Sequence, residues 1–157
     1  DYRRALPHLE ELSRRGALDA QTRRELAEAY LASGRAKEAA AIYEELLEGF
    51  APLPEDAATA ARAFQAAGQG RRAEELAREI LKDDPGDAAA SGILLDGAIR
   101  GRRLAEAESI LRSMIERNPG SARLREKLGD VLMWAGKFAE AEAQYKAASP
   151  APKGKTR

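Results

Sequence analysis

The stretch LGDVLMWAGKFAEAEAQY, residues 128–145, decides the fold. Apolar residues recur every three or four positions up to Trp134, and a similar stripe resumes after Gly136 and Lys137. This spacing is typical of a helix with one buried face, and a glycine directly after such a stripe is typical of a helix end. The stretch therefore predicts two helices that are joined by a tight turn.

The same pattern returns every 34 residues along the chain. Repetition at a fixed period of this size indicates stacked supersecondary units that bury their apolar faces against one another. One column of the repeat holds Ala5, Ala39, Ala73, Ala107 and Ala141, and another holds Gly34, Gly68 and Gly136. In the third unit, Arg102 stands at the position of the turn glycine, directly after Gly101.

Helix starts and stops fit this register. Pro54, Asp87 and Ser121 lie where a helix should begin, and these residue types favour the first helical position or the N-cap. The Asp-Pro and Asn-Pro pairs at 84–85 and 118–119 predict helix ends, because the residue before a proline avoids the helical region.

Residues 128–145 resemble the Leu-Gly…Gly-x-[Tyr/Phe]…Ala…Tyr pattern of tetratricopeptide repeats, and DYRRALPHLEEL at the N-terminus resembles the second helix of such a repeat. The resemblance covers nearly all of the chain. It implies an all-α fold, a right-handed solenoid of helical hairpins that forms a tetratricopeptide superhelix. Pro7 fits the first helix only if that helix begins late. The expected parts are a half repeat over 1–19, whole repeats over 20–53, 54–87, 88–121 and 122–148, which together make an array over 1–148, and a disordered, basic, proline-rich tail over 149–157.

Composition and charge narrow the function. Lys and Arg total 26 and Asp and Glu total 26, whereas a nucleic-acid surface usually needs a basic excess. No apolar run reaches the roughly 20 residues of a membrane-spanning helix, so we expect no direct membrane insertion. The chain has no cysteine, and its single histidine, His8, has no nucleophile or metal-ligand motif around it. We therefore expect no enzyme activity, no catalytic residues, no metal and no cofactor.

The resemblance implies that the first helices line a concave surface, on which a protein or peptide partner lies. On each first helix a stripe spaced i, i+4, i+7 falls on that side, as at Arg24, Glu28 and Leu31. Its mixture of both charges with apolar side chains suits a protein segment with apolar anchors. The acids Glu28, Asp96 and Asp130 disfavour RNA, which prefers basic or stacking residues. The predicted groove residues are Arg24, Glu28, Leu31, Arg62, Gln65, Asp96, Ile99, Arg100, Arg123, Asp130, Met133 and Trp134.

Two functional alternatives remain open at this stage. Trp134 is either a binding anchor or a side chain that covers an end of the array. Repeats that clamp a C-terminal carboxylate carry Lys and Asn at set positions. Those positions hold Arg24, Glu28 and Thr59 here, so we expect no tight binding of chaperone tails.

The segment LMWAGKFAEA, residues 132–141, is similar to repeats of bacterial polysaccharide-export proteins. The alternative function is therefore a periplasmic scaffold or assembly domain of an export or secretion machine, acting through self-association or docking at the array ends.

Overall fold

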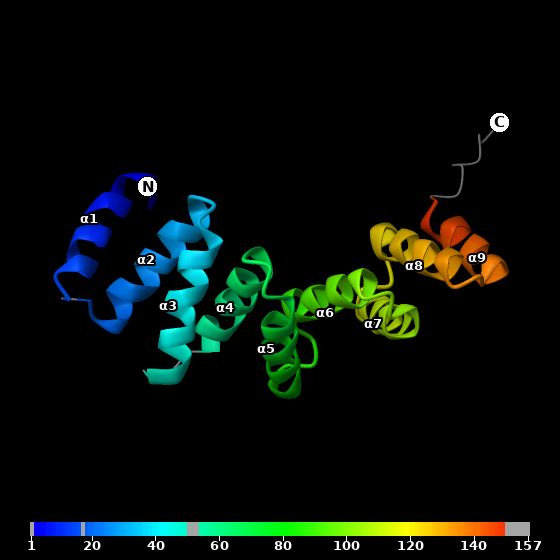
Figure 1. Ribbon diagram of the computed structural model, residues 1–157. Helices are drawn as coiled ribbons and strands as arrows, with labels where there is room; N and C mark the ends of the chain where they lie inside the picture. The colour runs from blue at the N-terminus through cyan, green and yellow to red at the C-terminus, as the bar shows by residue number, and fades with distance from the viewer. Residues whose placement is uncertain (1, 17, 50–53, 150–157) are drawn as a thin grey trace. The chain divides into compact units, whose positions relative to one another are not determined.

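The computed structural model describes residues 2–16, 18–49 and 54–149. Every regular element in these three ranges is an α-helix, and short turns join the helices (Figure 1). The helices are α1 (Tyr2–Arg14), α2 (Ala20–Ala32), α3 (Ala36–Gly49), α4 (Pro54–Ala66), α5 (Gly70–Asp83), α6 (Ala88–Arg100), α7 (Leu104–Arg117), α8 (Ala122–Trp134) and α9 (Phe138–Ala148). The predicted all-α class is confirmed.

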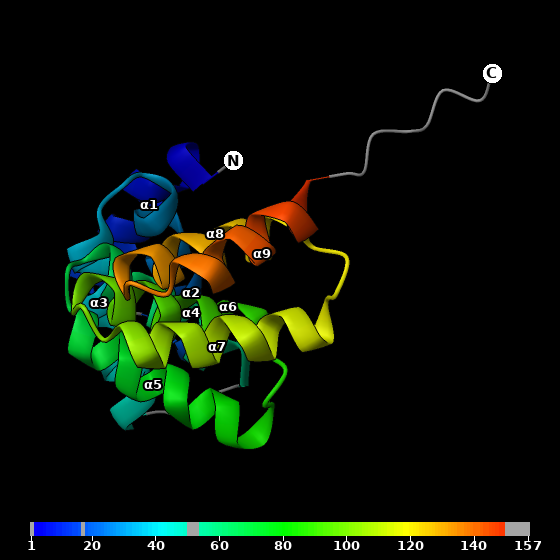
Figure 2. The same cartoon turned by 90° about the vertical axis from the view of Figure 1, so that its right-hand side faces the viewer.

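The chain divides into two compact units between Ile93 and Leu94, inside α6. In the first unit, each helix from α1 to α4 packs against the next one along the chain. In the second unit, α7 packs against α8, and α8 packs against α9. The last two helices lie side by side in both views (Figure 1, Figure 2). Each unit is thus built from neighbouring helices that follow one another in sequence.

Alanine forms much of the buried surface of the first unit. Ala39 and Ala73 of the repeated alanine column are completely buried, whereas Ala5 on α1 is exposed. The larger side chains Tyr43 and Phe64 are also completely or almost completely buried. Because the distance between packed helices depends on the side chains at the contact, a small residue lets neighbouring backbones approach closely.

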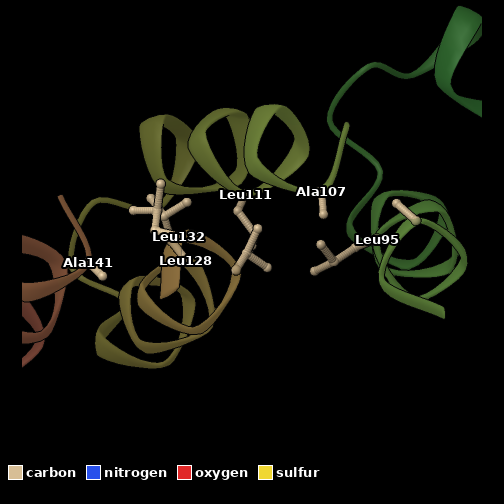
Figure 3. Close-up of a cluster of buried hydrophobic side chains, with 8 residues drawn as sticks. Leu95, Ala107, Leu111, Leu128, Leu132 and Ala141 are labelled. Carbon is tan, nitrogen blue, oxygen red and sulfur yellow. The ribbon is translucent and has the colours of Figure 1, made fainter. Parts of the chain in front are cut away.

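The core of the second unit draws side chains from four helices (Figure 3). Burial of one leucine side chain contributes about 1.5–3 kcal/mol, so this cluster is a main source of stability for the unit. Its members are Leu95 and Ala98 of α6, Ala107 and Leu111 of α7, Leu128, Val131 and Leu132 of α8, and Ala141 of α9.

The turns between paired helices share one backbone conformation. The turn position has a φ of +75° at Gly34, +80° at Gly68 and +75° at Gly136. In the third turn Arg102 takes this position with a φ of +57°. The next residue, Arg103, donates its N–H to the Ala98 carbonyl at 2.8 Å, and the corresponding bond closes the other turns. Since the left-handed region costs a residue with a side chain about 1–2 kcal/mol, Arg102 strains this turn.

Gly129 allows α8 and α9 to approach closely. A Cβ atom at this position would lie 2.5 Å from Cε1 of Tyr145, which is closer than van der Waals contact allows. The Tyr145 hydroxyl donates to Oδ1 of Asp130 at 2.7 Å. The Tyr145 ring of α9 therefore packs directly on the α8 backbone at Gly129.

The predicted helix starts are confirmed. Asp87 Oδ1 accepts the Ala90 N–H at 2.6 Å, and Ser121 Oγ accepts the Leu124 N–H at 3.3 Å. Pro54 is the first residue of α4.

The helix ends also agree with the sequence, but the expectation for Pro7 was wrong. α5 ends at Asp83 and α7 at Arg117, next to the predicted stops. α1 begins at Tyr2 and runs through Pro7. Pro7 is the sixth residue of α1, beyond the first four N–H groups that have no helical acceptor, so it costs the helix one backbone hydrogen bond. Residues 150–157 of the predicted tail lie outside the described residues.

Candidate functional site

The helices α2 and α4 of the first unit line an open pocket of about 410 Å³. Leu31 and Ala66 give it an apolar part, and Glu28 and Arg62 bring opposite charges. Thr59 adds a hydroxyl group. The pocket thus combines apolar surface with a carboxylate, a guanidinium and a neutral polar group.

A second pocket of about 160 Å³ shares Glu28 and Thr59 with the first one. Because the two pockets have these residues in common, they are neighbours, and we call them together the α2–α4 groove. The second pocket is also lined by Gln21, Arg24, Glu25, Tyr43 and Asp56.

A buried ion pair joins α2 to α4 beneath this groove. Arg24 Nε lies 2.7 Å from Asp56 Oδ1, and Arg24 Nη2 lies 2.8 Å from Asp56 Oδ2. The side chains of Arg24 and Asp56 are only 15% and 3% exposed. This bidentate geometry is the strongest way in which arginine binds a carboxylate, and it fixes the orientation of both side chains. Breaking this buried pair by removal of one partner would cost about 3–5 kcal/mol.

Tyr43 of α3 lies under the same groove with 1% of its surface exposed. Burial raises the pKa of its phenol to about 12, and the carboxylates of Glu28 and Asp56 act in the same direction. A hydrogen bond with Thr59 lowers this pKa, but it only partly offsets the burial. The phenol therefore stays neutral at physiological pH.

Among the predicted groove residues of the first unit, Arg24, Glu28, Leu31 and Arg62 line the α2–α4 groove. Gln65 is half-buried on α4. Sequence reasoning missed the parts that Tyr43, Thr59, Asp56 and Ala66 play in the groove. The repeat register gave a usable signal for the ion pair, since Arg24 and Asp56 carry opposite charges on successive first helices.

The predicted groove residues of the second unit have several different environments. Ile99 is half-buried and packs against the core cluster, so little of its apolar surface is available. The carboxylate of Asp130 accepts the Tyr145 hydroxyl. Met133 and Trp134 are 43% and 51% exposed, so both offer apolar surface to solvent. Asp96, Arg100 and Arg123 are exposed.

The described residues can also be checked for a metal site, a membrane-spanning helix and a further pocket. They hold no cluster of three or more side chains suited to a metal ion. None of the helices α1 to α9 is long and apolar enough to cross a bilayer. A further pocket of about 500 Å³ lies at the turn between α4 and α5, where Arg72 is already bound to Glu44 at 2.9 Å. Compared with this further pocket, the α2–α4 groove has the more varied chemistry.

Two tetratricopeptide repeat family models match the chain. One matches residues 1–57 and again 58–122, and the other matches residues 98–154. No curated protein matches the chain by sequence.

Several solved structures share the fold. A structure of MamA MSR-1 superimposes with a TM-score of 0.81 at 17% identity, over 94% of this chain and 84% of that one. MamA 41-end from Desulfovibrio magneticus RS-1 gives 0.80 at 15% identity, over 94% and 83%. MamA AMB-1 gives 0.71 at 24% identity, over 82% and 70%. At these identities the likeness establishes the helical repeat fold.

Proposed function

Because the chain belongs to the tetratricopeptide repeat family, we propose that it is a binding scaffold that holds a protein partner in the α2–α4 groove. The family and the fold make the chain a protein-interaction scaffold. The proposal goes one step further and assigns the partner to the α2–α4 groove, where binding involves no catalytic step. The observation that carries it is the joint lining of one open pocket by an apolar pair, a carboxylate and a guanidinium.

The groove suits a partner segment with an apolar side chain next to a basic one. Leu31 and Ala66 can cover an aliphatic or aromatic side chain of the partner. The Glu28 carboxylate can accept hydrogen bonds from a partner lysine or arginine, because each carboxylate has about four acceptor positions. The Arg62 guanidinium can donate to backbone carbonyl groups of the same segment. An extended peptide or one face of a partner helix would satisfy these contacts.

The buried contacts beneath the groove support a binding role. The Arg24–Asp56 pair links α2 to α4, and Tyr43 fills the space under them. Helices that are fixed in this way keep the groove open before the partner arrives. A preformed site binds more tightly, because less conformational freedom is lost on association.

In the second unit we propose Met133 and Trp134 as additional contact residues. Both are exposed, and aromatic side chains are frequent among the residues that dominate binding energy. These residues would give the second unit a contact surface of its own.

A site-specific photo-crosslinker at position 66 tests the proposal. Ala66 is exposed and lines the groove, so a crosslinker there should capture the partner from a lysate of the source cell. The control position is Ala41, which is exposed on α3 and lies outside the groove lining.

A charge reversal at Arg62 provides a second, independent test of the same proposal. Arg62→Glu should reduce capture about tenfold, as expected for the loss of one interfacial hydrogen-bonded charge. Lys82→Glu on α5 makes the same change of charge at an exposed site and should leave capture unchanged. Equal capture from positions 66 and 41, or equal loss with both charge reversals, would show that the partner binds elsewhere.

A further inference from the structure

The two pockets of the α2–α4 groove differ in charge. Three carboxylates and one guanidinium line the narrower pocket of about 160 Å³. The guanidinium belongs to Arg24, and both carboxylate oxygens of Asp56 bind it. This leaves the carboxylates of Glu25 and Glu28, which lie on the same helix, α2. The wider pocket of about 410 Å³ is balanced, since Glu28 and Arg62 bring one charge of each sign.

The other side chains of the narrower pocket are polar and uncharged. The Gln21 amide donates to Oε1 of Glu25 at 3.2 Å, and the Tyr43 phenol is neutral at physiological pH. Thr59 adds a hydroxyl group. A positive charge from a partner would therefore complement the negative excess of this pocket. Because Glu28 is half-buried, salt screens such a contact less than it screens one on an open surface.

The two pockets follow one another in the same order on both helices. On α2, Glu25 lines only the narrower pocket and Leu31 only the wider one. On α4, Asp56 lines only the narrower pocket and Ala66 only the wider one. With a rise of about 1.5 Å per residue, Glu25 and Leu31 are separated by about 9 Å along α2. The groove thus offers a negative pocket and a partly apolar pocket at a defined spacing.

The Arg62 guanidinium favours an extended partner over a helical one. It has about five N–H donors, and one of them bonds to Oγ1 of Thr59 at 3.3 Å. The side chain is exposed at the wider pocket. An extended segment offers backbone carbonyl groups to such donors, whereas the carbonyl groups of a helix are bonded internally. In a polyproline II segment, residues three positions apart face the same side and are separated by about 9 Å, which matches the spacing of the pockets.

We propose that the groove selects an extended segment in which a lysine or arginine lies three positions from a large apolar residue. This selectivity rests on the proposed function and adds the sequence that the groove recognises. The basic side chain enters the narrower pocket and donates to Glu25 and Glu28, since its slender apolar stem can carry the charge past the rim. The apolar side chain covers Leu31 and Ala66, and Arg62 donates to the backbone between the two pockets.

Selection of a random peptide library displayed on phage, with the whole chain as target, tests the proposal. Enriched peptides should carry a lysine or arginine three positions from leucine, isoleucine or an aromatic residue. Exchange of that basic residue for methionine in a synthetic peptide should weaken binding about tenfold in calorimetric titrations. The Glu25→Gln, Glu28→Gln double variant should weaken binding of the original peptide by a similar factor. It should bind the methionine peptide as well as the natural chain does, because the charges act as a pair.

The matched control is Glu79→Gln on α5, which changes an exposed glutamate outside the lining of both pockets. It removes the same charge and should leave the affinity unchanged. Circular dichroism must show equal helicity for all variants. A photo-crosslinker at position 66, compared with one at position 41, shows whether the enriched peptides lie in the groove.

The outcomes separate this selectivity from the proposed function. Peptides that crosslink at position 66 but lack a basic residue would overturn the selectivity alone. So would peptides whose affinity the double variant leaves unchanged, or helical peptides with a spacing of seven residues, which is about two helical turns. Peptides that crosslink equally at positions 66 and 41, or a selection that enriches no peptide, would overturn both.

Discussion

An exchange of arginine and glycine between two equivalent turns should move the stability of the second unit in opposite directions. Arg102 has a φ of +57°, and Gly136, one repeat later, has a φ of +75°. Arg102→Gly removes the side chain from a left-handed conformation, and Gly136→Arg introduces one. A Cβ atom at Gly136 meets no other atom within 4 Å, so the second substitution acts through the backbone rather than through a clash.

The size of the effect follows from two opposing contributions. A residue with a side chain loses about 1–2 kcal/mol in the left-handed region. Glycine gives the unfolded chain more freedom, which offsets about 0.5–1 kcal/mol of that gain. Arg102→Gly should therefore stabilise the unit by roughly 0.5–1 kcal/mol, and Gly136→Arg should destabilise it by a similar amount. Because the two turns belong to different repeats, the double variant should lie close to the natural chain.

Urea unfolding measures both shifts. Trp134 is the single tryptophan of the sequence and ends α8, so its fluorescence reports on the unit that holds both turns. Arg102→Gly should raise the midpoint, and Gly136→Arg should lower it, with an unchanged dependence on urea concentration. If both variants shift the midpoint in the same direction, backbone conformation does not decide the stability of these turns and the reasoning is wrong.

Three further predictions concern packing and ionisation. Gly129→Ala should destabilise the second unit by about 1–3 kcal/mol, because the new methyl group overlaps the Tyr145 ring. In a Tyr145→Leu background the same substitution should cost much less stability. Equal losses of stability in both backgrounds would exclude this overlap. Bonds from Lys137 and Arg112 lower the pKa of Glu108 in the folded chain. The stability that these bonds provide should therefore be complete above the unfolded pKa, near 4.5, and should be lost as the pH falls through the lower folded pKa. Carbon-detected NMR should place its midpoint below 4.5, and Lys137→Met should raise it. Tyr43 should ionise near pH 12 in an ultraviolet titration, and Tyr43→Phe should remove that step. The stability that the neutral, buried phenol contributes is complete below about pH 10 and is lost as the pH rises to about 12.

The sequence predicts the helices well because their signals are local. The apolar stripe, the turn glycine and the N-cap each depend on residues within one or two turns of chain. Asp87 and Ser121 show this, since each caps the helix that its position predicts. Pro7 is the exception, because its effect depends on how far α1 extends before it.

The groove could be predicted only in part, because its geometry depends on contacts between separate helices. The i, i+4, i+7 rule selects Glu28, Leu31 and Arg62, which line one pocket. It gives Ile99 the same role, although this side chain packs against the core of the second unit. Periodicity along one helix gives the direction of a side chain, but the neighbouring helix determines whether the space in front of it is filled.

Substitutions inside the repeats are compensated on the facing helix. Leu95 stands in the column where the fourth repeat has Gly129, and Leu111 stands where that repeat has Tyr145. Leu95 and Leu111 belong to one core cluster (Figure 3). Tyr145 instead covers the backbone of Gly129. Two leucines thus lie in one core cluster in the third repeat, whereas in the fourth repeat a tyrosine ring packs where glycine has no side chain. Since such pairs conserve volume, the fold tolerates their variation. Exposed positions have no such constraint, so the exposed residues that line the α2–α4 groove are free to differ from those at the same positions of other repeats.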